Sequence, residues 1–246
     1  MQQFRADLHI HTLLSPCGDV EMTPRNIVQK AKASQLDIIG ITDHNSTKNA
    51  LLVKKLAAKE GIFVLTGAEV TTREEVHCLT FFETEEQLNL FQQFIDENIT
   101  KIPNDEEYFG YQPVIDDDEN ILEMIPYFLP AALKQNITKV QQQVEKLNGI
   151  FIPAHIDRSV NGILSQLGFI PPGLKCDALG LSKHGSKKDV EQQYVLQNKI
   201  TLIRNSDAHY MEQIGEICSI FNMNEINFSE IKMALNQQGN RFVEIR

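Results

Sequence analysis

The feature that most constrains the fold is a regular alternation of β-rich and helical runs. We expect strands at 4–10, 37–42, 62–70, 76–82, 150–155, 177–182, 200–206, 216–222 and 241–245. Helical patterns lie between most of these runs, at 24–34, 46–60, 84–99, 136–148, 187–198 and 227–238. Repetition of strand then helix predicts a mostly parallel sheet with right-handed crossovers, in an α/β barrel or an open doubly wound sheet.

One segment interrupts this alternation. Residues 101–135 contain four prolines and acidic groups at 105–107 and 116–119. A solvated excursion from the barrel explains this composition, and a functional lid is the alternative. We therefore expect a single barrel domain over residues 1–246, with an excursion or insertion at about 101–135.

Length and charge limit the classes of function. A chain of 246 residues buries enough surface to fold without a disulfide or a structural metal, so a metal-ligand set here is expected to be functional. The net charge is −10, and binding to long nucleic acid requires Lys and Arg to neutralise phosphates. We expect no long nucleic-acid partner. A small phosphorylated substrate stays open because bound metal ions reverse the local field.

The composition also bears on location. No apolar run approaches the roughly 18–20 residues of a membrane span, and the N-terminal residues lack the apolar core of a signal peptide. The four cysteines are scattered and form no Cys-x-x-Cys pair. We expect a cytoplasmic protein with reduced thiols and no membrane partner, and the oligomeric state stays open.

The first strand ends in a pattern typical of metal ligands. In Asp7-Leu8-His9-Ile10-His11, strand alternation predicts Asp7, His9 and His11 on one face, with Leu8 and Ile10 on the other. Two imidazoles two residues apart at the end of a strand form a natural pair of metal ligands.

Histidines and carboxylates recur at the other strand ends. Each alone also fits a structural role, such as a core histidine, a turn residue or a helix cap. A parallel barrel, however, brings these strand ends to one rim, where they would repel or stay unpaired without a cation. Asp43 and Asp157 also follow strand ends. We therefore predict two or three divalent metal ions, held by residues from this set: His9, His11, His44, Glu69, His77, His155, Asp207 and His209.

Taken in order, these motifs resemble those of the polymerase and histidinol phosphatase (PHP) family. The resemblance extends over residues 7–209. It implies a distorted TIM-like (β/α)7 barrel with a metal site at its C-terminal mouth, and many relatives are phosphoesterases. The matching motifs are Asp7-Leu8-His9-Ile10-His11-Thr12, Ile41-Thr42-Asp43-His44, Gly67-Ala68-Glu69, His77, Pro153-Ala154-His155 and Ser206-Asp207-Ala208-His209.

The resemblance also implies which residues hold each ion. One ion takes His9, His11, Glu69 and Asp207, a second takes the bridging Glu69 with His77 and His155, and a third takes His44 and His209.

Some relatives supply a further ligand to the third ion from the loop after the first strand. This sequence offers Cys17 there, or Asp19 as the alternative. A thiolate favours zinc, whereas a carboxylate leaves manganese or iron equally open. Cys17 could instead be a buried loop cysteine without a metal.

The predicted reaction is metal-dependent hydrolysis of a phosphoester, either a small phosphomonoester or a nucleotide-type substrate. A hydroxide that bridges two ions would attack phosphorus in line. Glu69 and Asp207 belong to this catalytic set, with Asp43 as a proton carrier or as an orienter of the ligands.

Three further residues lie just beyond strand ends and are candidates for binding the substrate phosphate: Arg158, Lys183 and His184. They could equally be solvated charges on the rim. Other functions also stay open. They are an exonuclease or phosphodiesterase acting on short nucleic-acid ends, a hydrolase of C–N bonds, and a non-catalytic metal-binding regulatory module.

Overall fold

The computed structural model describes residues 1–188, 190 and 200–245. Within these residues the main sheet is mixed. Its strand order is β11 (Phe242–Ile245), β10 (Ser219–Met223), β1 (Gln2–Ile10), β2 (Ile38–Ile41), β3 (Phe63–Thr71), β4 (His77–Phe82) and β7 (Ile150–Pro153). β1, β2 and β3 are parallel, whereas β4 is antiparallel to both of its neighbours, and β10 and β11 extend the sheet antiparallel. The expectation of a mostly parallel sheet was wrong on this point.

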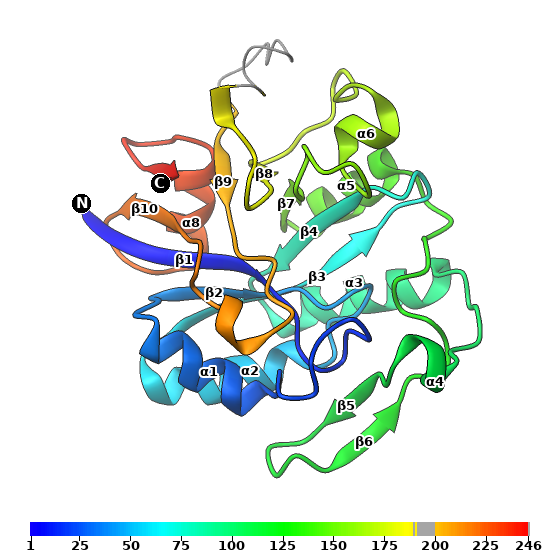
Figure 1. The fold of residues 1–246 in the computed structure, drawn as a ribbon. Coiled ribbons are helices and arrows are strands. Elements are labelled where there is room, and N and C mark those ends of the chain that lie inside the picture. The colour runs from blue at the N-terminus through cyan, green and yellow to red at the C-terminus, as the bar shows by residue number, and fades with distance from the viewer. Residues whose placement is uncertain (189, 191–199, 246) are drawn as a thin grey trace.

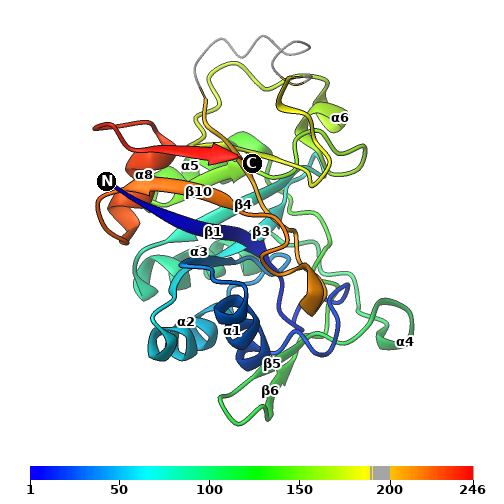
Figure 2. The same ribbon diagram turned by 60° about the vertical axis from the view of Figure 1, so that its left-hand side comes forward.

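The sheet curls into a partial barrel (Figures 1 and 2). β8 (Leu179–Leu181) and β9 (Leu202–Arg204) form a separate parallel pair. This pair is tied to the end of β7 by Ile156 N, which donates to Gly180 O at 2.8 Å. Beyond β9, Ala208 N donates to His9 O at 3.1 Å and joins the segment to β1. The predicted TIM-like α/β fold is confirmed, as a distorted barrel.

Helices cover both sides of the curled sheet. Figures 1 and 2 show α1 and α2 on one side of β1, with α5 and α8 on the other. α1 begins after Thr23, whose hydroxyl accepts from Asn26 N, and its first residue is Pro24, as predicted. The described helices are α1 (Pro24–Ala33), α2 (Ala50–Ala57), η1 (Ala58–Glu60), α3 (Glu85–Asn98), α4 (Glu106–Phe109), α5 (Ile137–Lys146), α6 (Ile163–Leu167), η2 (Met211–Gln213) and α8 (Phe228–Leu235).

Most predicted helices are confirmed, with shorter bounds. α2 begins at residue 50 rather than 46. Within residues 45–49, the Asn45 side chain donates to Leu129 O and the Asn49 side chain donates to Pro113 O. The short elements α6 and η2 were not predicted. The helix expected at 187–198 lies, apart from 187, 188 and 190, outside the described residues. No helix in the described part of the chain is long and apolar enough to cross a membrane.

Residues 101–135 are folded rather than merely solvated. They contain α4 and the hairpin of β5 (Pro113–Ile115) and β6 (Ile121–Met124), which extends beyond α2 in Figure 1. The buried Gln112 side chain accepts from Leu129 N and donates to Tyr127 O, each at 2.8 Å. Asn45 also donates to Leu129 O and Ala131 O. This packing attaches the segment to the barrel, although a single domain over the whole chain stays a prediction.

A bulge in β1 changes which side chains face inward. The register between β1 and β2 shifts between Asp7 and Ile10. Leu8 consequently packs into the cluster covered by α8, whereas Ile10 packs against α1 and α2. The expectation that Leu8 and Ile10 share a face was therefore wrong. Gly40 lies opposite the bulge, where a Cβ would come within 2.6 Å of Leu8 O.

We predict that Gly40→Ala destabilises the fold by about 2 kcal/mol, because the added methyl group must displace backbone atoms of β1. Urea unfolding with an unchanged m-value measures this loss. Gly180→Ala in β8 is the matched control, since its Cβ would lie 3.3 Å from the nearest atoms and should cost less. Equal stability of the Gly40→Ala variant and the wild type would show that β1 tolerates the methyl group.

Candidate metal centre

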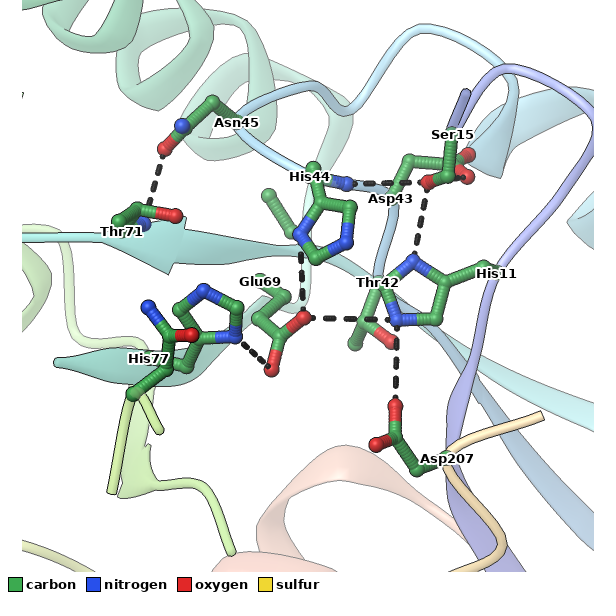
Figure 3. A network of polar contacts seen from close by, with 12 residues as sticks. His11, Ser15, Thr42, Asp43, His44, Asn45, Glu69, Thr71, His77 and Asp207 are labelled. Carbon is green, nitrogen blue, oxygen red and sulfur yellow. Dashed lines mark hydrogen bonds and ion pairs between the residues drawn. The ribbon is translucent and has the colours of Figure 1, made fainter. Parts of the chain in front are cut away.

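A buried carboxylate lies at the centre of the candidate site. Glu69, near the end of β3, is 1% exposed, and in the described part of the chain its two oxygens contact five imidazoles. Figure 3 shows three of these contacts, with His11, His44 and His77. The contacts of Oε1 are His9 Nε2 at 3.2 Å, His77 Nδ1 at 3.0 Å and His155 Nε2 at 3.1 Å. Those of Oε2 are His11 Nε2 at 3.4 Å and His44 Nδ1 at 3.2 Å.

Strand directions explain this convergence. The parallel strands β1, β2 and β3 end at one edge of the sheet, which places His11, His44 and Glu69 together. His77 begins β4 rather than ending it. Because β4 is antiparallel to β3, His77 pairs with Thr71 and lies at the same edge. His155 follows β7, which is also antiparallel to β4.

The segment after β9 brings a second carboxylate. Asp207 Oδ1 lies 3.2 Å from His9 Nε2 and 3.5 Å from His11 Nε2. Asp207 has φ 55° and His155 has φ 27°, both in the left-handed region that costs energy for residues other than glycine. His209 Nδ1 lies 3.7 Å from Asp207 Oδ1. The strained backbone at Asp207 and His155 thus positions the side chains of two predicted ligands.

Asp7 holds that segment rather than joining the histidines. Its Oδ1 accepts from Ser206 N and its Oδ2 from Gly215 N, each at 3.0 Å. Burial raises the pKa of Asp7 to about 6, although these hydrogen bonds oppose the shift. The expectation that Asp7 shares a face with His9 and His11 was wrong, because the bulge in β1 interrupts the alternation.

The donor atoms are spaced as ligand atoms around a shared ion would be. His44 Nδ1 and His77 Nδ1 are buried and lie 3.2 and 3.0 Å from Glu69 oxygens, yet neither forms a hydrogen bond with any residue that the structure describes. His9 Nε2 and His11 Nε2 approach to 3.1 Å. Ligand atoms about 2.0–2.2 Å from one ion lie roughly 3.0–3.5 Å apart, which matches this spacing.

Three sets of donor atoms in the described residues lie within 4.8 Å of one another: His9, His11, Glu69 and Asp207; His44, Glu69 and His77; and His11, His44 and His209. The chemistry of these imidazole and carboxylate sets fits divalent transition metals.

The electrostatics of the cluster also fit cation binding. Burial alone would raise the pKa of Glu69, but the surrounding imidazoles, His77 and His9 foremost, hold it well below its usual range. Burial lowers the pKa of His209 to about 4 and that of His44 well below its ordinary value, so both rings are neutral. Burial would also lower the pKa of His11, but hydrogen bonds to Asp207 and Glu69 raise it to about 10. His44 and His209 are thus already in the neutral form that binds metal, whereas His11 would have to release a proton when a metal binds.

Asp43 lies one layer behind these donors. Its carboxylate accepts from Ser15 Oγ at 2.7 Å, Thr12 N at 2.7 Å and Thr12 Oγ1 at 2.8 Å. These contacts favour a role for Asp43 in orienting the metal ligands over a role as a proton carrier. Both roles stay predictions. Ser15 was not identified from the sequence, because a serine in a loop after a strand carries no distinguishing pattern.

The three candidate phosphate contacts are not equivalent. Arg158 Nη1 lies 2.7 Å from Asp207 Oδ2 and its side chain is 47% exposed, at the edge of the cluster. Lys183 instead pairs with Glu216 through contacts of 2.6 and 2.7 Å. His184 is exposed and belongs to none of the donor sets found in the described residues. The structure brings only Arg158 of these three, all of which it describes, into contact with a predicted ligand.

Neither candidate from the loop after β1 joins a donor set among the described residues. Cys17 is exposed, so the alternative of a buried loop cysteine was wrong. Asp19 Oδ1 accepts from Glu21 N at 2.8 Å, and Asp19 N donates to His209 O at 2.8 Å. The loop therefore lies beside His209, and the choice of Cys17 or Asp19 as a further ligand stays a prediction. Asp157, the remaining strand-end carboxylate, accepts from Ser182 N at 2.7 Å and lies outside these donor sets.

We predict that Glu69→Gln lowers divalent metal affinity by at least about 100-fold, because the carboxylate that contacts five imidazoles loses its charge. Isothermal titration of the metal-free protein with Zn²⁺ measures the affinity. Glu86→Gln, an exposed residue of α3, is the matched control and should bind as the wild type does. Unchanged affinity of the Glu69→Gln variant would remove Glu69 from the ligand set.

Known proteins share parts of this sequence and the whole of this fold. The uncharacterized protein MJ1587 of Methanocaldococcus jannaschii is 38% identical over 78 residues, which cover 28% of this chain and 46% of that protein. The uncharacterized protein YqxK of Bacillus subtilis is 23% identical over 275 aligned residues, covering 98% of this chain and 64% of that protein.

Two structures of endonuclease Q have the same fold. The lesion-specific enzyme from Pyrococcus furiosus has a TM-score of 0.75 and 20% identity, covering 98% of this chain and 58% of that one. A complex of endonuclease Q with a 27-mer duplex that carries an abasic lesion has a TM-score of 0.71 and 18% identity, with the same coverage. The chain thus spans less than two thirds of each of these relatives.

The family assignment comes from a match to a family sequence model. The PHP domain model matches residues 7–156, which is more than half of the chain and includes all the predicted ligands up to His155. The resemblance inferred from the motifs is confirmed. The chain belongs to the PHP domain family.

Proposed function

We propose that the chain is a phosphoesterase that uses two or three divalent ions, of zinc, manganese or iron. The observation that carries this proposal is the buried Glu69 carboxylate in contact with imidazoles from four separate segments. Bound divalent ions would supply an activated water and a Lewis acid for the phosphoryl oxygens. We also propose that the chain forms one domain and acts in the cytoplasm.

The ligand sets follow the geometry, with one change from the family pattern. His9, His11, Glu69 and Asp207 form one donor set, as predicted. His44 rather than His155 completes the compact set with Glu69 and His77, although His155 Nε2 lies 3.1 Å from Glu69 Oε1. We assign all these residues, with His209, to metal binding, and Glu69 as the bridge between ions.

Arg158 is our first candidate for the substrate phosphate. One guanidinium nitrogen contacts Asp207, and the half-exposed side chain leaves further N–H donors at the edge of the cluster. A guanidinium can donate two parallel hydrogen bonds to a phosphate. Lys183 is a weaker candidate because Glu216 already neutralises it.

We propose a small phosphomonoester or nucleotide-type substrate. A second candidate is a phosphodiester at a nucleic-acid end. It is favoured by the fold shared with endonuclease Q, whose complex holds a 27-mer duplex with an abasic lesion at the active site. The net charge of −10 weighs against binding of a long polyanion, which is why this function is second.

We predict that full removal of metal by EDTA abolishes hydrolysis and that added Mn²⁺ or Zn²⁺ restores it. A panel of phosphomonoesters, phosphodiesters and amides, assayed with each metal, identifies the scissile bond. Activity that survives complete metal removal would sink the proposed function. Activity on amides alone would replace it with C–N bond hydrolysis.

Arg158→Gln should raise KM for the best phosphate substrate by about 10-fold or more, since a charge-assisted contact is lost. Lys183→Gln is the matched control and should leave KM within about twofold, because its partner is Glu216. Steady-state kinetics measure both. A larger rise in KM for Lys183→Gln than for Arg158→Gln would indicate that the phosphate binds near Lys183 instead.

The two substrate candidates differ in their response to salt. If single-stranded oligonucleotides are substrates, their binding should weaken steeply between about 50 and 200 mM salt, because counterions are released from neutralised phosphates. A phosphomonoester should show a shallow dependence in the same assay. Tight, salt-sensitive binding of oligonucleotides would make the nucleic-acid function the first candidate.

A further inference from the structure

A buried hydroxyl lies directly behind two of the candidate metal ligands. We propose that Ser15 is a positioning residue that fixes the ring of His11 and the backbone of His44, with Asp43 acting through it. The proposal deepens the metal-dependent function above and rests on it. It assigns a role to a side chain that lies outside the sequence motifs quoted above.

Three groups converge on the Ser15 hydroxyl, and all are buried (Figure 3). Ser15 Oγ lies 2.7 Å from Asp43 Oδ1, 2.9 Å from His11 Nδ1 and 3.2 Å from His44 N. The hydroxyl thereby links the loop after β1 to the loop after β2. Each of these loops carries one of the histidines.

The protons in this network can be assigned by elimination, beginning at Thr12. Thr12 Oγ1 accepts from Leu14 N and from Asn49 Nδ2, each at 3.1 Å. Its own proton is then donated to Asp43 Oδ2 at 2.8 Å, while Thr12 N donates to Asp43 Oδ1 at 2.7 Å. Burial raises the pKa of Asp43, although His11 and the hydrogen bonds from Ser15 and Thr12 oppose the shift. In its ionised form the carboxylate can only accept, and Asp43 then also takes the proton of the Ser15 hydroxyl.

That assignment determines the tautomer of His11. With its proton donated to Asp43, Ser15 Oγ can only accept from its two remaining neighbours. The backbone N–H of His44 is one donor, and the ring Nδ1–H of His11 is the other. His11 Nε2 is then the nitrogen left for a metal, and it faces Glu69 Oε2 at 3.4 Å and Asp207 Oδ1 at 3.5 Å.

The same contacts define the role of Asp43 in this network. Its three accepted hydrogen bonds come from Ser15 and Thr12, so its carboxylate reaches the ligands through the Ser15 hydroxyl. A carboxylate behind a metal-binding imidazole orients the ring and raises its basicity. In this chain the effect is transmitted through one intervening hydroxyl, and Asp43 is a positioning residue rather than a proton carrier.

The test is metal affinity rather than activity. Metal-free wild type and Ser15→Ala are titrated with Co²⁺ while the visible absorption is followed. We expect Ser15→Ala to bind Co²⁺ about 10- to 100-fold more weakly, the loss typical of removing a group that orients a ligand. Equal affinity and an unchanged spectrum would overturn the proposal.

Ser219→Ala is the matched control. The Ser219 hydroxyl is also fully buried, donates to Arg204 O and accepts from Arg204 N, each at 2.9 Å, and lies on β10 outside the donor sets. The Ser219→Ala substitution should lower the melting temperature of the metal-free protein without changing its Co²⁺ affinity. A similar loss of affinity in both variants would mean that Ser15 acts only through general stability, which would also overturn the proposal.

A double-mutant cycle tests the link to Asp43. If Asp43 acts through Ser15, Asp43→Asn should weaken Co²⁺ binding in the wild type but add little to Ser15→Ala. Additive losses would show that Asp43 acts independently of Ser15 and would contradict the proposed relay.

A measurement on the wild type keeps the proposal testable if Ser15→Ala does not fold. Long-range ¹H–¹⁵N spectra of the Zn²⁺-loaded protein should show His11 protonated at Nδ1, with the metal at Nε2. Metal at Nδ1 would overturn the proposal. Failure of the wild type to bind either Zn²⁺ or Co²⁺ would instead contradict the proposed function, so the two failures are distinguishable.

Discussion

The structure depends on one buried negative charge. Glu69 is almost fully excluded from solvent, and burial of a carboxylate is costly unless positive charge or hydrogen bonds compensate for it. Here the compensation comes from imidazoles rather than from lysine or arginine. Imidazoles can be neutral ligands, so the same groups that stabilise the carboxylate also make a site for divalent ions. The packing of several histidines in contact is otherwise difficult to explain.

The fold meets this constraint through its irregularities. The reversed strand β4 returns His77 to the edge where Glu69 lies, and the bulge in β1 separates Asp7 from the histidines that follow it. Strained backbone occurs at Asp207 and His155, where ligand side chains must turn inward. Such departures from regular structure are common beside functional sites, because they aim side chains that a regular strand would point elsewhere.

Much of the site could be predicted because strand ends carry the chemistry. The coincidence of histidine and carboxylate after apolar runs identified Glu69 and its contacts without a structure. Alternation alone misplaced Asp7, because a bulge leaves no clear mark in a sequence apart from the glycine opposite it, Gly40. The short elements of residues 101–135 were missed because prolines and brief strands give no periodic signal.

Side-chain partners were harder to predict than positions. Arg158 and Lys183 follow strand ends in the same way, yet only Arg158 contacts a predicted ligand, because Glu216 from a distant segment pairs with Lys183. The position of Ser15 behind His11 depends equally on contacts between two loops. Such pairings are set by tertiary structure, whereas the ligand types at strand ends are set by local sequence.

The central claim is that divalent ions occupy the space around Glu69. Anomalous diffraction at the zinc absorption edge, from crystals of the Zn²⁺-loaded protein, tests it most directly. The account predicts at least two peaks, with Glu69 bridging them and His9, His11 and Asp207 about 2.0–2.2 Å from one of them. Absence of an anomalous peak within coordination distance of Glu69 in fully loaded crystals would contradict it.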